Sequence, residues 1–102
     1  MKEIKPKDVQ KRLEAGETLN IIDVRELDEV KEGHIQNIIH IPLGELESRI
    51  NELDPNKEYI MVCRSSARSG KATAYLEANG YNVVNMVGGM LAWEGKTENI
   101  FN

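Results

Sequence analysis

The residue best suited to chemistry is Cys63, the only cysteine among the 102 residues of the chain. It closes the apolar run 59–62 and opens a short polar segment, 64–68, and a helix is predicted to begin at Ser69. Helix N-termini and nearby arginines lower the pKa of a thiol below its reference value of about 8.5. The sequence therefore predicts that Cys63 is a thiolate nucleophile that carries a group covalently.

The segment after Cys63 is also suited to hold an anion. The first N–H groups of a helix are unpaired, and a loop that curls over them can aim further N–H groups inward. Small side chains let this backbone approach the anion, and arginines add positive charge. The residues concerned are Arg64, Ser65, Ser66, Ala67, Arg68 and Ser69.

Two other interpretations of Cys63 have to be weighed. A free cysteine is often only a small buried hydrophobe, but the arginines and the helix start argue against that here. Cysteine-dependent phosphatases use a Cys-x5-Arg loop, whereas the spacing here is Cys-x4-Arg, which also disfavours an arsenate reductase of related architecture. The shorter loop makes a smaller cradle, which suits one extra sulfur atom on Cys63 better than a phosphate.

The elements around the loop alternate between strand-like and helix-like patterns. This alternation predicts an α/β fold whose parallel sheet has helices on both faces. The strand-to-helix loops then share the C-terminal edge of the sheet, where such folds bind ligands, so the segment 23–25 can face Cys63. The predicted helices are 6–15, 26–32, 43–53, 69–79 and 90–94, and the predicted strands are 19–24, 38–41, 59–63 and 81–86, with 2–5 as an added edge strand.

Several segments together resemble the rhodanese family of sulfurtransferases. The loop Cys63-Arg64-Ser65-Ser66-Ala67-Arg68-Ser69 is similar to the active-site loop of that family. Matching segments before and after it are Ile22-Asp23-Val24-Arg25-Glu26, Glu29, Gly33-His34-Ile35, Ile41-Pro42, and Gly88-Gly89-Met90 with Trp93. The resemblance implies that residues 1–102 form a single rhodanese-like domain with a five-stranded, mainly parallel sheet, and that no cofactor is needed.

The resemblance also implies roles for individual residues. Cys63 would become a persulfide, Arg68 would brace the cradle, and Arg64 would attract anionic donors. Asp23 and Arg25 would support the loop, although a purely structural ion pair is the alternative for them. Many family members have Gly where this chain has Ser66, so a serine would be strained there if the position needs a positive φ. Two histidines, His34 and His40, on different elements make a poor metal set, and no metal is expected.

Composition limits the other function classes. The net charge of −4 argues against nonspecific binding to nucleic acid. No apolar run is long enough to span a membrane, and the charged N-terminus lacks a signal-peptide pattern, so a cytoplasmic protein is expected.

The function that these observations favour is transfer of sulfane sulfur through a Cys63 persulfide. The expected donors are thiosulfate or a low-molecular-weight persulfide, and the expected acceptors are a thiol or cyanide. The alternative is a persulfide carrier module that serves a partner protein and has little activity on thiosulfate. A phosphatase or arsenate reductase and a non-catalytic binding domain are less favoured.

Overall fold

The structure is a computed structural model that describes residues 1–101, and it is built on one five-stranded sheet. The strand order is β1-β5-β4-β2-β3, and every neighbouring pair is parallel. This confirms the predicted α/β fold and its sheet, including the edge strand at the N-terminus. The strands are β1 (Lys2–Ile4), β2 (Ile21–Asp23), β3 (Ile39–His40), β4 (Glu58–Val62) and β5 (Asn82–Met86).

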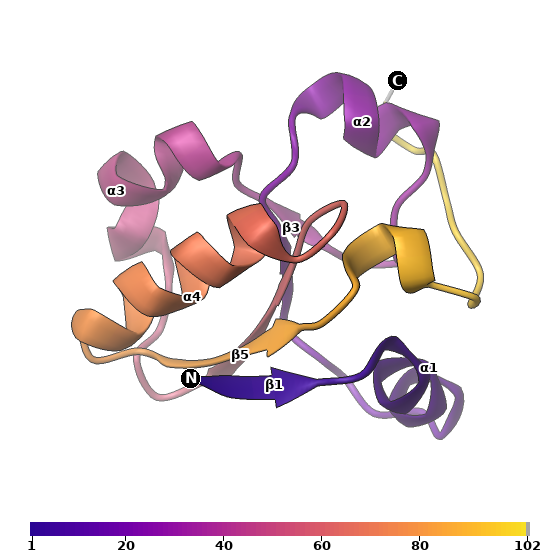
Figure 1. Cartoon of the computed structure of the whole chain (residues 1–102), viewed down its shortest axis with the longest axis horizontal. Helices are drawn as coiled ribbons and strands as arrows, with labels where there is room; N and C mark the ends of the chain where they lie inside the picture. Colours follow the sequence, from indigo (N-terminus) through magenta and orange to yellow (C-terminus); the bar gives the residue numbers. More distant parts are fainter. Residues whose placement is uncertain (102) are drawn as a thin grey trace.

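Helices cover both faces of the sheet (Figure 1). One face packs against α1 (Pro6–Glu14), and the other packs against α3 (Leu46–Arg49) and α4 (Ala67–Ala78). The short helix α2 (Leu27–Glu32) follows β2. The described residues also form three single turns of 3-10 helix, η1 (Leu43–Glu45), η2 (Ile50–Glu52) and η3 (Gly89–Ala92).

Strand β4 lies inside the sheet and is apolar on both faces, as a central parallel strand must be. Because side chains alternate along a strand, Ile60 and Val62 pack on the α1 side and Met61 packs on the α4 side. Burial of each such side chain stabilises the fold by roughly 1.5–3 kcal/mol. Cys63 continues this alternation and belongs to the core cluster on the α4 side. The core therefore fixes where the thiol points.

Three helix predictions need correction. The predicted helix 90–94 is the 3-10 turn η3, which ends at Ala92. Helix α4 begins at Ala67, not at Ser69, because Ser66 turns the chain with a φ of +88° and is the N-cap. The predicted helix 43–53 is divided into η1, α3 and η2. The apolar residues of this segment do recur at helical spacing, but the backbone departs from α-helical dihedrals at Glu45 and at Arg49, where φ is −104° and −112°.

Within residues 1–101, no helix is long and apolar enough to cross a membrane.

Candidate active site

Cys63 lies where β4 meets the loop that leads into α4. Its side chain has an exposed fraction of 0%, and its sulfur accepts a hydrogen bond from the Ser66 amide at 3.1 Å. The chain therefore curls around the sulfur within three residues. This is the inward-facing N–H geometry that the small side chains of the segment were expected to allow.

The left-handed backbone of Ser66 makes this curl possible. Its φ of +88° and ψ of −6° are rare for a residue other than glycine. Such a conformation costs of order 1–3 kcal/mol and is kept only where the surroundings impose it. The position does have the positive φ under which a serine was expected to be strained.

The polar environment favours the thiolate form of Cys63. Burial raises the pKa of the thiol, but the Ser69 hydroxyl and the amides of Ser69, Ser65 and Ser66 together lower it by more. The result is a pKa below the ordinary value. The donors at the start of α4 were expected to have this effect, because they are the unpaired N–H groups of a helix N-terminus.

The turn at Gly88-Gly89 leads into η3, which is hydrogen-bonded to the loop that begins at Cys63. The Met90 amide donates to the Cys63 carbonyl at 2.8 Å, and the Leu91 amide donates to the Arg64 carbonyl at 3.0 Å. A Cβ on Gly89 would lie 2.5 Å from both of these carbonyl oxygens, and its φ is +56°. Only glycine lets η3 approach the loop so closely.

Arg68 spans the space between α4 and α2. Its guanidinium donates to both carboxylate oxygens of Glu29, at 2.7 and 2.8 Å. This fork, together with the Glu26 amide, lowers the pKa of Glu29 to about 2 against the opposing effect of burial. Much of the Arg68 charge is therefore engaged by Glu29 rather than directed at the sulfur.

Asp23 and Arg25 form a closed network on the neighbouring loop. Arg25 donates to the Asp23 carboxylate through Nε and through a terminal nitrogen, the latter at 2.8 Å, and the same nitrogen donates to the Gly33 carbonyl at 2.8 Å. The two residues are 1% and 6% exposed. This geometry fixes the ends of α2 and fits the structural alternative for the pair.

The outer side of the loop is open to solvent. Arg64, Ser65 and Ala67 are exposed. Arg64 is exposed, and within residues 1–101 its guanidinium has no hydrogen bond or ion pair, so it is available to a ligand. The expected site residues thus divide into an inner cradle of Cys63, Ser66 and Ser69 and an outer rim.

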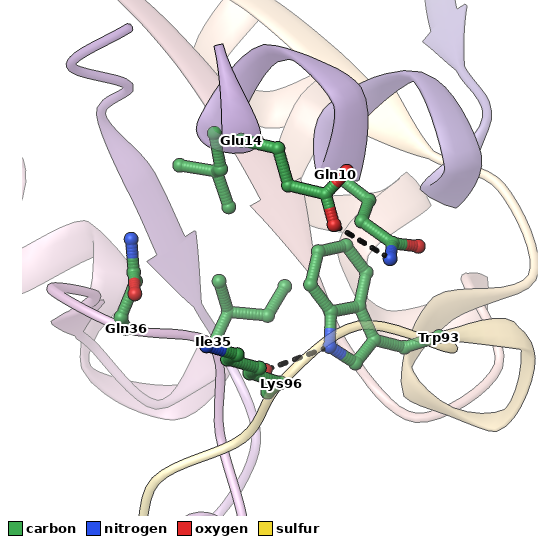
Figure 2. A pocket seen from close by; sticks show the side chains of 7 residues that line it. Gln10, Glu14, Ile35, Gln36, Trp93 and Lys96 are labelled. Atoms are coloured by element: carbon green, nitrogen blue, oxygen red, sulfur yellow. Dashed lines mark hydrogen bonds between the residues drawn. The ribbon is translucent and has the colours of Figure 1, made fainter. Parts of the chain in front are cut away.

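A cavity of about 280 Å³ lies away from Cys63 (Figure 2). It is on the α1 side of the sheet, whereas Cys63 belongs to the core cluster on the α4 side. Its Trp93 indole donates to the Lys96 carbonyl at 3.1 Å. The cavity is therefore not the space in which a Cys63-bound group would sit. It is lined by Gln10, Leu13, Glu14, Ile35, Gln36, Trp93 and Lys96.

Two residues that contact the Cys63 loop and the start of α4 were not predicted as site residues. Glu29 was noted only as part of a family pattern, and its partner Arg68 is 39 positions away in the sequence. Asn85 is a 4% exposed amide in β5, and its Oδ1 accepts the Ser69 hydroxyl at 2.6 Å. A polar residue inside the apolar run 83–86 was the signal that could have drawn attention to Asn85.

Comparison with known proteins places the chain in a family. The family model described as "Rhodanese-like domain" matches residues 5–96. The "Putative sulfurtransferase YtwF" of Bacillus subtilis is 44% identical over 98 residues, which cover 96% of this chain and 95% of that protein.

Two further relatives extend this likeness. The "Putative sulfur carrier protein YrkF" of Bacillus subtilis is 43% identical over 94% of this chain, a match that spans 52% of that longer protein. A solved structure of a rhodanese-like domain protein from Staphylococcus aureus superposes with a TM-score of 0.91 at 36% identity. It covers 96% of this chain and 97% of its own chain.

Proposed function

This chain belongs to the rhodanese-like domain family of sulfurtransferases, and from that premise we propose that Cys63 carries sulfane sulfur as a persulfide. The donor would be thiosulfate or a low-molecular-weight persulfide, and the acceptor would be cyanide or a thiol. The proposal extends the general sulfur-transfer chemistry of the family to a definite nucleophile and definite substrates.

The observation that carries the proposal is the donor set around the Cys63 sulfur. The Ser66 amide donates to it at 3.1 Å, and the lowered pKa of the thiol reflects further donors from Ser65 and Ser69. A pKa below the ordinary value provides more thiolate near neutral pH, and the thiolate is the reactive form.

The reaction would proceed in two displacements. In the first, the Cys63 thiolate attacks the sulfane sulfur of the donor, a sulfur–sulfur bond forms, and sulfite or a thiolate leaves with the electron pair of the broken bond. In the second, the acceptor attacks the outer sulfur, and the bond to Cys63 breaks to return the thiolate. Neither leaving group needs a general acid, because sulfite and thiolates are stable anions near neutral pH.

The loop residues would divide this work. The inward N–H groups of the segment 64–69 would stabilise the negative outer sulfur of the persulfide, as anion-binding backbone does elsewhere. The exposed guanidinium of Arg64 would attract an anionic donor to the rim. Arg68 would hold the loop against α2 through its fork to Glu29.

Turnover of thiosulfate and cyanide tests the proposal. The wild-type chain should form thiocyanate and sulfite in equal amounts. The rate should rise with pH and level off at a lower pH than it would for a thiol of ordinary pKa. The variant C63S should lose this activity, whereas E47Q, which alters an exposed carboxylate on α3, should keep it. Activity that survives in C63S would refute the proposed nucleophile.

One observation favours a second candidate, a persulfide carrier that serves a partner protein. The rim residues Arg64, Ser65 and Ala67 are exposed, so another protein could dock over the loop and pass sulfur directly. The relative named as a sulfur carrier supports the same idea. A gain of one sulfur atom from a persulfide donor, combined with negligible turnover of thiosulfate, would favour the carrier.

A cytoplasmic location fits either function. Cys63 is the only cysteine, and its chemistry requires a free thiol, which reducing compartments maintain. The test is the redox state of Cys63 in cells: trapping with an alkylating agent should find it as thiol or persulfide, and a mixed disulfide as the main form would argue against this location.

A further inference from the structure

A buried amide lies behind the sulfur cradle, on a strand that the mechanism above does not use. Asn85 of β5 is 4% exposed, and its Oδ1 accepts the Ser69 hydroxyl at 2.6 Å. Its Nδ2 lies 3.5 Å from the Ser66 carbonyl. Asn85 therefore contacts Ser66, whose amide donates to the Cys63 sulfur, and Ser69, which lowers the pKa of Cys63.

The Ser69 hydroxyl has one proton and two acceptors near it. In the structure the proton points to Asn85, yet the same hydroxyl is among the groups that lower the pKa of Cys63. A hydroxyl donates one hydrogen bond at a time. Since Ser69 is fully buried, no water can supply a substitute, and the two acceptors must compete for it.

We propose, on the basis of the function proposed above, that Asn85 is a positioning residue that shares the Ser69 proton with the Cys63 sulfur. The hydroxyl turns to the sulfur when the sulfur is a thiolate. It returns to the Asn85 oxygen when that sulfur carries no charge, as in the thiol or as the inner sulfur of a persulfide.

This arrangement has a consequence for sulfur transfer. A buried hydroxyl or amide without a partner costs free energy comparable to a lost hydrogen bond, so the second acceptor stabilises the persulfide relative to the free thiolate. Competition from Asn85 also keeps the thiolate from being stabilised too strongly. The intrinsic nucleophilicity of a thiolate falls as its pKa falls, and Asn85 would limit that loss.

The test is the pH dependence of Cys63 alkylation by iodoacetamide, followed together with the ultraviolet absorption of the thiolate. The variant N85L keeps the approximate shape of the side chain and removes both hydrogen-bonding groups. The Ser69 hydroxyl then has only the sulfur as acceptor, so the apparent pKa of Cys63 should fall by about 0.5–1 unit. A merely structural role would loosen the loop and raise the pKa instead.

A double-mutant cycle identifies the route of the effect. The variant S69A should raise the apparent pKa of Cys63, and in the S69A background N85L should cause no further shift. The exposed residue of the same strand, Asn82, provides the control N82A, which should leave the pKa unchanged. If leucine is not accommodated in the core, N85A removes the same groups without adding bulk and should give the same direction.

The proposal is overturned if N85L and N85A raise the pKa or leave it unchanged, or if they shift it equally with and without Ser69. Alkylation requires only a thiol, so this result is independent of sulfur transfer. A wild-type chain that never takes up sulfur would refute the proposed function while the alkylation profiles still decide the role of Asn85.

Discussion

Two loops leave the same edge of the sheet from neighbouring strands, and they use their polar groups in opposite ways. In the loop after β2 the charged groups bind each other. Asp23 and Arg25 are buried, and Arg25 donates hydrogen bonds to the Asp23 carboxylate and to the Gly33 carbonyl. The loop after β4 directs its donors at Cys63, and its exposed Arg64 remains available to a ligand.

The comparison shows that position at the ligand-binding edge does not by itself make a residue reactive. The closed hydrogen-bond network after β2 holds two elements together. The loop after β4 instead directs N–H donors at the Cys63 sulfur, so it can stabilise a negative charge that forms there. The fork between Arg68 and Glu29 connects α4 and α2, the helices that follow the two loops, so the rigid region supports the reactive one. Changes in the first should mainly affect stability, and changes in the second should mainly affect the thiol.

The largest expected effect is on stability, from removal of Asp23. The variant D23A leaves the Arg25 guanidinium buried without its partner, and such a loss costs about 3–5 kcal/mol of unfolding free energy. Chemical denaturation measures it. The exposed pair of Glu45 with Arg49 gives the control E45Q, which should change stability little. A stable D23A protein with lost sulfur transfer would reverse the roles assigned to the two loops.

The second largest effect should come from a substitution of Gly89, in the turn that contacts the loop. A Cβ there would overlap the Cys63 and Arg64 carbonyls at 2.5 Å, and the positive φ adds strain, so G89A should lose at least about 2 kcal/mol of stability and most sulfur transfer. G80A is the matched control, because Gly80 has a φ of +86° with nothing within 4 Å. Equal losses in both variants would mean that strain alone, and not contact with the loop, matters.

The ion pair of Arg68 with Glu29 should contribute about 1 kcal/mol to the free energy of unfolding, since the Glu29 side chain is 26% exposed and solvent screens the pair. The folded-state pKa of Glu29 is about 2, below its ordinary 4.5. The contribution is therefore complete above pH 4.5 and disappears as the pH falls through about 2.

The variant E29Q should lose stability near neutral pH and show a flatter acid limb in denaturation measured as a function of pH. The exposed Glu32 of the same helix provides the control E32Q, whose acid limb should match the wild type. An unchanged acid limb in E29Q would contradict the role of the fork.

The smallest effect should come from S66G. Glycine relieves the strain of the left-handed φ but is more flexible in the unfolded chain, so stability should rise by no more than about 1 kcal/mol. The donor to the sulfur is the backbone amide of this residue, so the alkylation profile of Cys63 should be unchanged. A large shift of that profile would show that the serine side chain itself acts on the thiol.

Much of the fold could be predicted because its signals are local or periodic. The apolar runs mark the buried strands, and their alternation with helices determines the parallel sheet. The start of α4 could not be placed, because it depends on a serine in a conformation that serine seldom adopts. The divided helix 43–53 escaped detection because apolar residues at spacings of three and four fit both α and 3-10 turns.

The candidate site was predictable only in part, for a related reason. Cys63 and its loop are contiguous, so their chemistry can be read from neighbouring residues. Glu29 and Asn85 reach the loop across 39 and 16 positions, and their roles depend on how separate elements pack. Likewise, the hydrogen bonds of the Arg25 guanidinium to Asp23 and to the Gly33 carbonyl could not be predicted, because they depend on how these groups lie in the folded chain.

A single-turnover measurement tests the central claim, that the loop after β4 makes Cys63 a sulfur carrier. The chain is loaded with a persulfide donor, freed of excess donor and examined by peptide mass spectrometry before and after cyanide is added. We expect one added sulfur atom on the peptide that contains Cys63, and cyanide should remove it as one equivalent of thiocyanate. The absence of sulfur on that peptide, or sulfur that cyanide cannot remove, would contradict the claim.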